Sequence, residues 1–354
     1  MYKEIAIIGV SGKFPLANNL KTFHENLAVG MDCIQVISEE RRKLLDLKTD
    51  VNYWKIGFID QIDSFDNKFF GISNREAAQM SPEQRLSLEL VAHTIWNAGY
   101  SLSDFRGSNC GVFLSSSDNE YQDIIEEETG LSFIGNMKFM LPGKIAFTFD
   151  LHGPSMMIDT GCSATLVALH EACMKLASEE IEYALVGGIN INLVIPEINT
   201  GNILNVNATD GRSKSFDYRA DGTGAGEGGG YLLLKNLESA LSDKDYIYGI
   251  IKGSSVNNDG ARSSDVVSPS VEGQKEAMLR AWSISGINVD NITEFEAHGT
   301  GTKIGDPIEI SGIEDSLKEV GCCSKQIELG ALKSNIGHLM QAAGVASIIK
   351  VSVK

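Results

Sequence analysis

Short apolar runs alternate with helix-length segments along most of the chain. Runs of this kind, rich in Ile, Val, Leu and Met, are typical of strands that are buried on both faces of a sheet. They predict strands at Ile5–Gly9, Cys110–Leu114, Met156–Asp159, Tyr183–Gly188, Tyr231–Leu234, Ile247–Gly253, Thr293–Glu296 and Ile327–Leu332. Because segments long enough for helices separate these runs, the pattern indicates βαβ units and a mainly parallel sheet, and therefore an α/β fold.

A glycine-rich stretch, DGTGAGEGGG at Asp221–Gly230, invites comparison with a phosphate-binding loop. It precedes a predicted strand instead of opening a helix, and it lacks the Lys-Ser/Thr ending of a P-loop. We therefore predict a tight turn here and no nucleotide site.

No low-complexity segment or long linker divides the chain, yet its two halves resemble each other weakly. Each half contains a strand, a helix and a strand, with polar residues at the strand ends. A seam near Leu237–Lys244 predicts two domains, residues 1–240 and 241–354. The last segment, Gly344–Lys354, has the apolar density of a buried helix but no C-cap glycine and no following strand. The second half is therefore expected to be incomplete.

Composition excludes several classes of function. The 354 residues are 43% hydrophobic and 22% charged, which is ordinary for a globular chain. No apolar run approaches the ~20 residues that a membrane-spanning helix needs, and the N-terminus is a poor secretory signal, so a cytoplasmic location and no membrane partner are expected. A formal net charge of −17 argues against nucleic acid. The six cysteines form no CxxC pair and have no zinc spacing, so no metal site is predicted.

Cys162 lies where a buried strand is expected to turn into a helix. The strand Met156–Ile158 runs into Asp-Thr-Gly, and an apolar segment that predicts a helix buried on all sides follows the cysteine. Unpaired backbone N–H groups at a helix N-terminus are expected to lower the thiol pKa and so favour the nucleophilic thiolate. The alternative is a small buried hydrophobic residue, which describes most free cysteines. The motif alone leaves both interpretations open.

Two histidines lie in glycine-bracketed loops that follow predicted strands. His298 lies in FEAHGTGTKIGDPIE, where Asp306 and Pro307 predict the start of an acidic-capped helix. His338 lies in GALKSNIGHLMQAAG. A lone histidine is often a core residue with satisfied hydrogen bonds. Polar groups at the carboxyl ends of parallel strands, however, are where open α/β sheets bind ligands, which favours a functional role for both.

These segments resemble the catalytic signatures of one family. DTGCSATL at Asp159–Leu166, EAHGTGTKIGDPIE at Glu296–Glu309 and KSNIGHLMQAAG at Lys333–Gly344 look like the three signatures of β-ketoacyl synthases, in the same order. The likeness is strongest to ketosynthase domains of modular polyketide synthases. It extends from IAIIGVSGKFP at Ile5–Pro15 to the last residue. The resemblance implies an α/β, thiolase-type fold of two fused βαβαβ-type halves, with the second half incomplete, and a homodimer.

The resemblance also implies a mechanism and its residues. Cys162 would accept an acyl chain from the phosphopantetheine of an acyl carrier protein. His298 and His338 would stabilise the enolate formed when a malonyl-type extender loses carbon dioxide, and the resulting carbanion would attack the acyl group on Cys162. Lys333 and Glu309 match positions that order the site electrostatically in this family.

The same resemblance assigns the remaining binding residues and partners. Thr300 and Thr302 match threonines that hydrogen-bond the pantetheine arm, and Asn335 is also predicted to bind substrate. The implied partners are acyl carrier protein with its acyl and malonyl-type thioesters. No metal and no dissociable cofactor is implied.

The sequence departs from the family in places that leave alternatives open. Gly161 and Ala164 replace the family's usual Ala and Ser beside the cysteine, and both are small. Family members continue past Lys354 to a Gly-Phe-Gly-Gly-Thr-Asn segment whose N–H completes the oxyanion hole for the acyl thioester. One alternative is therefore an inactive or split-enzyme fragment that acts only as a structural or interaction partner, with another chain supplying the missing strands. Another is a different acyltransferase of the thiolase superfamily, since one fold serves several reactions.

Overall fold

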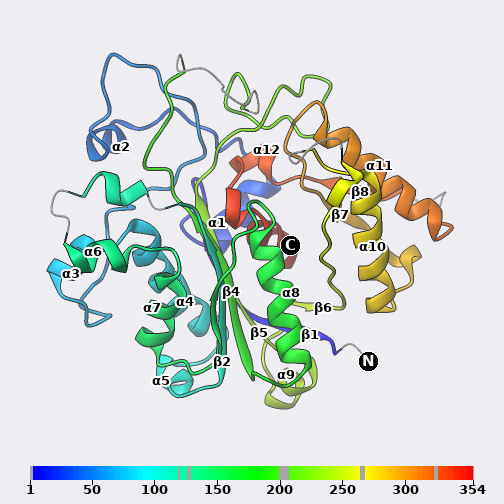
Figure 1. Cartoon of the computed structure of the whole chain (residues 1–354), viewed down its shortest axis with the longest axis horizontal. Coiled ribbons are helices and arrows are strands. Elements are labelled where there is room, and N and C mark those ends of the chain that lie inside the picture. The colour runs from blue at the N-terminus through cyan, green and yellow to red at the C-terminus, as the bar shows by residue number, and fades with distance from the viewer. Residues whose placement is uncertain are drawn as a thin grey trace.

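A mixed six-stranded sheet forms the centre of the molecule (Figure 1). The computed structural model describes residues 3–118, 120–125, 129–198, 207–263, 268–322 and 326–353. The sheet has the strand order β3-β2-β4-β5-β1-β6. Its strands are β1 (Ile5–Lys13), β2 (Cys110–Ser116), β3 (Ser155–Met157), β4 (Tyr183–Asn190), β5 (Gly228–Asn236) and β6 (Gly249–Ile251).

The prediction of a mainly parallel sheet is wrong for most of these pairings. β2 pairs in parallel with β3 and β4, whereas β5 runs antiparallel to β4 and β1, and β6 runs antiparallel to β1. The long connection between β4 and β5 returns the chain to the sheet in the opposite direction. Central strands of either direction are buried on both faces here, so their apolar runs do not reveal their direction.

Two layers of helices cover the sheet. α4 (Pro82–Asn97) and α7 (Met140–Phe149) pack on one face, and α8 (Ala164–Ala177) and α13 (Ala343–Ser352) pack on the other. Alternate residues of one strand serve the two layers: Val112 and Leu114 join the core under α4 and α7, and Phe113 joins the core under α8 and α13. The predicted C-terminal helix is confirmed.

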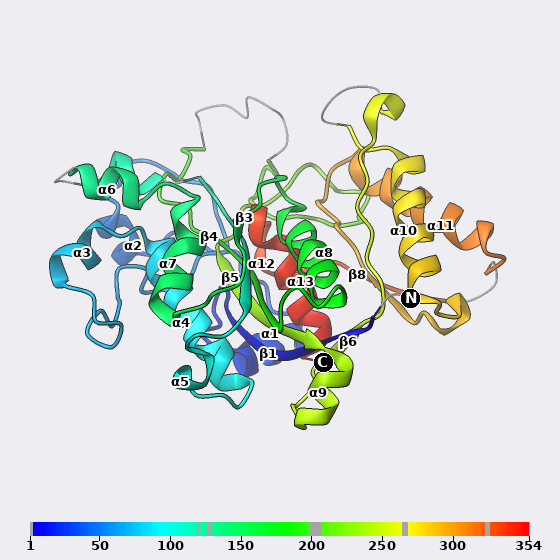
Figure 2. The same ribbon diagram turned by 60° about the horizontal axis from the view of Figure 1, so that its bottom comes forward.

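A second, two-stranded sheet lies outside the central sheet. β7 (Glu294–Glu296) and β8 (Glu328–Gly330) form a parallel pair, and α11 (Gly305–Glu319) connects them as a βαβ unit. α10 (Val271–Ser285) packs against α11. Figure 1 and Figure 2 agree in placing α10 and α11 on one side of α8, and α4 and α7 on the other.

Short helices connect these layers. They are α1 (Leu20–Ala28), α2 (Glu39–Leu44), α3 (Asn74–Gln79), α5 (Leu102–Phe105), α6 (Gly130–Gly135), α9 (Leu237–Asp243) and α12 (Lys333–Ile336), with 3₁₀ turns at Glu120–Asp123, Gly260–Arg262, Val289–Asn291 and Met340–Ala342. No helix in the described ranges combines the length and the apolar composition needed to cross a membrane.

The helix that follows Cys162 is only partly buried, contrary to the prediction from its composition. Ala168, Ala172 and Cys173 are fully buried against the sheet, but Leu166 is 45% exposed and Met174 is 47% exposed. The apolar residues therefore cover more of the helix surface than the sheet and α13 can bury.

Tyr231 offers a test of how the sheet and α4 are joined. Its side chain is fully buried, and its hydroxyl donates to Ser87 Oγ of α4 at 2.6 Å. Removing one partner of a buried hydrogen bond leaves the other unsatisfied. We expect Tyr231→Phe to lower the free energy of unfolding by about 1–3 kcal/mol, measured by urea denaturation. An unchanged midpoint would mean that this bond contributes nothing net.

Candidate active site

Cys162 lies in the turn between β3 and α8, as predicted from the sequence. Gly161 has a φ of +64°, a left-handed conformation that glycine adopts without strain. The Gly161 N–H donates to Asp159 Oδ1 at 3.2 Å, and Lys138 Nζ contacts Asp159 Oδ2 at 2.8 Å. The turn is thereby anchored to the segment that precedes α7, and Cys162 keeps partial solvent access.

The expected lowering of the Cys162 pKa is wrong in direction. Burial in the site raises the thiol pKa above its ordinary value, because the surroundings solvate a thiolate poorly. The positive charge of Lys333 offsets part of this increase. The prediction of a low thiol pKa rested on the helix N-terminus alone, because the atoms that cover the sulfur cannot be identified from the sequence.

His338 lies next to the thiol. Its Nε2 is 3.1 Å from Cys162 Sγ, and the side chain is buried. Its Nδ1 accepts a hydrogen bond from the Met340 backbone N–H at 3.0 Å. A neutral imidazole carries one proton, and a nitrogen that accepts a bond cannot carry it. The ring proton is therefore on Nε2, and His338 presents an N–H donor toward the sulfur.

His298 completes a cluster of three side chains. Its ring centroid lies 5.5 Å from that of His338, with the two planes at 85°. The loop is held by Glu309 of α11, whose two carboxylate oxygens accept the backbone N–H groups of His298 at 2.6 Å and Gly299 at 2.8 Å. Lys333 Nζ donates to the His298 carbonyl at 2.6 Å. The structure thus brings together all five residues predicted to be catalytic.

Both imidazoles are neutral at physiological pH. Burial among protein atoms, and then the charge of Lys333, lower the pKa of His298 to about 3. His298 itself keeps an exposed surface. The same two causes lower the pKa of His338 well below its usual range. Burial also lowers the pKa of Lys333 and raises that of Glu309.

The predicted binding residues divide into two groups. Thr300 Oγ1 and Thr302 Oγ1 lie 3.1 Å apart in the loop that follows His298. Asn335 of α12 uses its side-chain amide to donate to the Met31 carbonyl at 3.1 Å. The threonines are therefore beside the catalytic cluster, whereas the Asn335 amide holds the loop after α1. Their roles toward substrate stay predictions.

Asp306 has a different role from the helix cap predicted for it. α11 begins at Gly305, and the Asp306 side chain accepts from the Phe216 N–H at 2.7 Å and the Gly301 N–H at 3.1 Å. It therefore joins the His298 loop to the segment around residue 216. In the sequence, an Asp before a Pro indicates only a local feature, the start of a helix.

The segment of residues 207–223 supports the His298 loop, which sequence reasoning missed. Gly222 donates its N–H to the Gly301 carbonyl at 3.0 Å, and Thr223 Oγ1 donates to the Thr300 carbonyl at 3.0 Å. Ser215 also bonds the Gly299 carbonyl. These contacts join segments far apart in the sequence, so no local pattern announces them.

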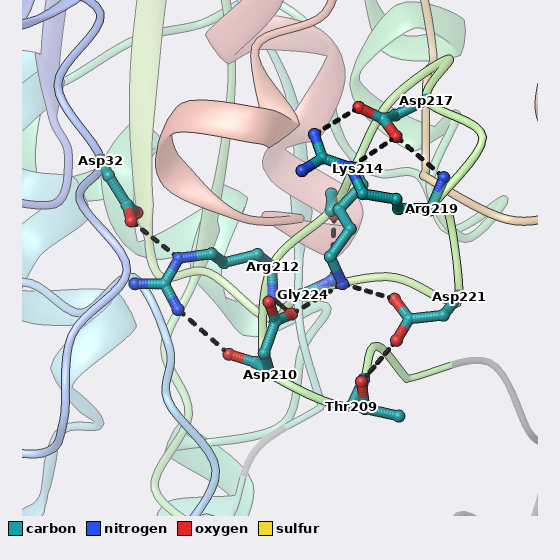
Figure 3. A network of polar contacts seen from close by, with 10 residues as sticks. Asp32, Thr209, Asp210, Arg212, Lys214, Asp217, Arg219, Asp221 and Gly224 are labelled. Carbon is teal, nitrogen blue, oxygen red and sulfur yellow. Dashed lines mark hydrogen bonds and ion pairs between the residues drawn. The ribbon is translucent and has the colours of Figure 1, made fainter.

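Ion pairs hold this supporting segment in shape (Figure 3). Lys214 Nζ lies 3.0 Å from Asp210 Oδ1 and 2.7 Å from Asp221 Oδ1. Arg212 Nε lies 2.7 Å from Asp32 Oδ2. Partly exposed pairs contribute little to stability, but several of them in one loop restrict its conformation.

The glycine-rich stretch is an extended segment beside His338, and the tight turn predicted there is wrong. The His338 N–H donates to the Gly224 carbonyl at 2.7 Å, and the Gly226 N–H donates to the His338 carbonyl at 3.0 Å. A Cβ at Gly226 would lie 2.4 Å from the Ile336 carbonyl oxygen. The glycines are therefore required by the close approach of two backbones.

The raised thiol pKa predicts a pH dependence for Cys162. The thiolate is the nucleophile, and below the pKa its fraction grows tenfold per pH unit. Alkylation by iodoacetamide, followed by mass spectrometry of the Cys162 peptide, should therefore rise about tenfold per unit and continue to rise beyond pH 8.5, the ordinary thiol pKa. A plateau reached below pH 8 would contradict the raised pKa.

A family model for the beta-ketoacyl synthase N-terminal domain matches residues 2–240, and one for the C-terminal domain matches residues 248–354. The chain is 37% identical to polyketide synthase PksN of Bacillus subtilis over 371 aligned positions, which cover 99% of this chain and 7% of that protein. It is 36% identical to polyketide synthase GfsA of Streptomyces halstedii, covering 98% of this chain and 5% of that protein. The chain thus spans a small fraction of these curated relatives.

Solved structures give the same result. The ketosynthase from module 6 of the bacillaene synthase of Bacillus subtilis has a TM-score of 0.90 at 35% identity, covering 99% of this chain and 61% of that chain. Ketosynthase twelve of the bacillaene synthase of Bacillus amyloliquefaciens has a TM-score of 0.90 at 34% identity, covering 99% and 64%. The chain belongs to the β-ketoacyl synthase family, as a ketosynthase domain of the polyketide synthase type, and the predicted thiolase-type α/β fold is confirmed.

Proposed function

We propose that this domain is a β-ketoacyl-[acyl carrier protein] synthase, an acyltransferase that extends a chain by decarboxylative condensation. The observation that carries the proposal is the Nε2–H of His338 directed at Cys162 Sγ over 3.1 Å, with Nδ1 occupied by the Met340 N–H. A fixed donor beside a nucleophilic sulfur fits a reaction in which negative charge develops on a thioester oxygen.

The first step loads the nucleophile. The Cys162 thiolate attacks the carbonyl of an acyl thioester on the phosphopantetheine of a carrier protein. The new carbon–sulfur bond forms as the bond to the pantetheine sulfur breaks, and the proton lost by Cys162 leaves on the departing thiol.

The second step makes the carbon–carbon bond. A malonyl-type thioester loses carbon dioxide, and the released electron pair gives an enolate whose oxygen is held by the N–H donors of His298 and His338. The enolate carbon attacks the acyl group on Cys162. The carbon–sulfur bond breaks, the sulfur leaves as a thiolate, and it takes a proton from water. The side chains of Glu309 and Lys333 hydrogen-bond the backbone of His298 and so fix the loop that carries one of these donors.

The side chains at the site need no organic cofactor for this chemistry, because the carrier's thioester activates both reactants. Within the described ranges, no group of three His, Cys, Asp or Glu side chains is arranged to hold a metal ion. The proposed partners are carrier proteins bearing acyl and malonyl-type groups.

Mass spectrometry tests this function. Incubation with an acyl-pantetheine thioester should add the acyl mass to the Cys162 peptide, and a malonyl-loaded carrier protein should then release it as a β-ketoacyl thioester. A folded domain whose Cys162 stays unmodified would refute the proposal and favour a binding role. Acylation without condensation would favour another acyl transfer.

A homodimer is the proposed assembly, and the outer edge of β3 supports it. In the described part of the chain, β3 pairs only with β2, so its other edge is open. α7 packs beside β3 and exposes Phe147 by 88%, and Phe139 at the N-cap of this helix is 62% exposed. A second copy would bury both the edge and these rings. Light scattering should give twice the mass of one chain, and Phe147→Asp should shift the measured mass toward that of a monomer. A monomer of the unchanged protein at micromolar concentration would contradict the proposed dimer.

A further inference from the structure

A buried ion pair lies behind the catalytic cluster and takes no part in the proposed chemistry. Glu227 is fully buried, and Arg41 of α2 is 4% exposed. Arg41 Nη2 lies 2.6 Å from Glu227 Oε2. Taking two charges out of water has a cost, and such a pair is weak evidence of stabilisation by itself. Its position therefore calls for another reason.

The Glu227 carboxylate joins three segments. Its Oε2 accepts the Ile59 N–H at 3.1 Å as well as Arg41, and its Oε1 accepts the Asn192 N–H at 3.1 Å. Arg41 Nη2 also donates to the Ile59 carbonyl at 2.8 Å. One side chain thus fixes the chain after α2 and the chain after β4 relative to its own backbone.

The Glu227 backbone directly follows Gly226, whose N–H bonds the His338 carbonyl. Gly57 donates its N–H to the Ala225 carbonyl at 3.0 Å, and Glu227 donates its N–H to the Gly57 carbonyl. On the other side, Gly226 donates to the His338 carbonyl. Residues 57, 225–227 and 338 therefore form three adjacent backbone segments with parallel bridges, and Glu227 sets the register between the first two.

The packing leaves this arrangement little freedom. A Cβ at Gly57 would lie 2.2 Å from the Ile336 carbonyl oxygen, and one at Gly337 would lie 2.3 Å from the Ala225 carbonyl oxygen. A shift of the segment containing Ala225 would therefore move the His338 loop. His338 contacts Cys162 while its Nδ1 accepts the Met340 N–H, and Met340 has an unusual φ of +44°.

We propose that Glu227, held by Arg41, is a positioning residue that orients the Nε2–H of His338 toward Cys162. It touches no reacting atom and acts through the backbone bonds of Gly224 and Gly226 to His338. The expected effect on condensation rests on the proposed function, whereas the expected effect on the orientation of His338 does not.

Glu227→Gln is the main test. Glutamine keeps the size but has a single acceptor oxygen, so its NH₂ group must face either Asn192 N–H or the two donors at the other oxygen. Condensation should fall roughly 10–100-fold, because small displacements of a catalytic group have large effects on rate. Acylation of Cys162 should stay within about twofold of the unchanged protein, since the turn that holds Cys162 is anchored elsewhere. Glu40→Gln, an exposed change on α2, is the matched control.

A spectroscopic measurement separates positioning from general stability. In ¹⁵N-histidine-labelled protein, the His338 resonances, identified by their loss in His338→Ala, should report a single Nε2–H tautomer. Glu227→Gln should give a mixture of tautomers, and Glu40→Gln should not. If Glu227→Gln does not fold, Arg41→Lys carries the same test, because lysine keeps the charge but cannot span Ile59 and Glu227 as a guanidinium does.

The outcomes are distinguishable. An unchanged His338 tautomer, or equal losses in acylation and condensation, would overturn the positioning role and leave the condensing function standing. A domain that never condenses but whose His338 tautomer shifts in Glu227→Gln would overturn the proposed function and leave the positioning role standing.

Discussion

Cys162→Ala is expected to abolish both acyl loading and condensation, with a loss on the order of 10⁶-fold, as when the nucleophile of another acyl-transfer enzyme is removed. The physical reason is that Cys162 Sγ is the atom next to the donor of His338, at 3.1 Å. The measurement is the rate of β-ketoacyl thioester release, together with the mass of the intact domain after incubation with the acyl thioester.

Cys173→Ala provides the control for this change. Cys173 lies on the same helix, is fully buried and packs in the core under α8 and α13. Its replacement should lower stability modestly and leave acyl loading intact. Acylation of Cys162→Ala at another residue, with condensation retained, would show that the nucleophile had been assigned wrongly.

His338→Ala is expected to slow condensation by roughly 10²–10³-fold, the usual loss when one donor to a developing oxyanion is removed. Loading should fall much less, because the Nδ1 of His338 is occupied and the ring cannot act as a base toward Cys162. The two half-reactions should be measured separately, by single-turnover release of carbon dioxide and by acylation of Cys162.

Two further variants make this prediction specific. His338→Asn keeps an N–H donor of similar reach and should recover part of the rate. His152→Ala changes an exposed histidine paired with Asp150 and should have no effect. Equal losses of loading and condensation in His338→Ala would indicate that the histidine acts as a general base, contrary to the geometry.

Much of the fold and site could be predicted because the informative signals are local. Each apolar run that predicted a strand does overlap a strand, from β1 to β8. Cys162, His298 and His338 were predicted to meet because each follows a strand, and they do. Lys333 and Glu309 could be predicted only from the family resemblance, because a buried lysine bonded to a backbone carbonyl has no sequence pattern of its own.

What could not be predicted depends on contacts between distant segments. The antiparallel course of β5 is invisible in a run of apolar residues that is buried on both faces. The raised pKa of Cys162 follows from the atoms packed around the sulfur. The extended course of Gly224 and Gly226 follows from the His338 loop beside them, more than 100 positions along the chain.

The backbone N–H of Met340 determines how protons move in this site. Because it fills the only basic nitrogen of His338, this imidazole cannot store the proton that the sulfur releases. In the proposed reaction that proton leaves on the carrier's outgoing thiol, and the Cys162 thiolate released by condensation takes one from water. In that reaction the loading step is tied to the departure of the carrier thiol, and the His338 imidazole keeps its Nε2–H throughout the cycle.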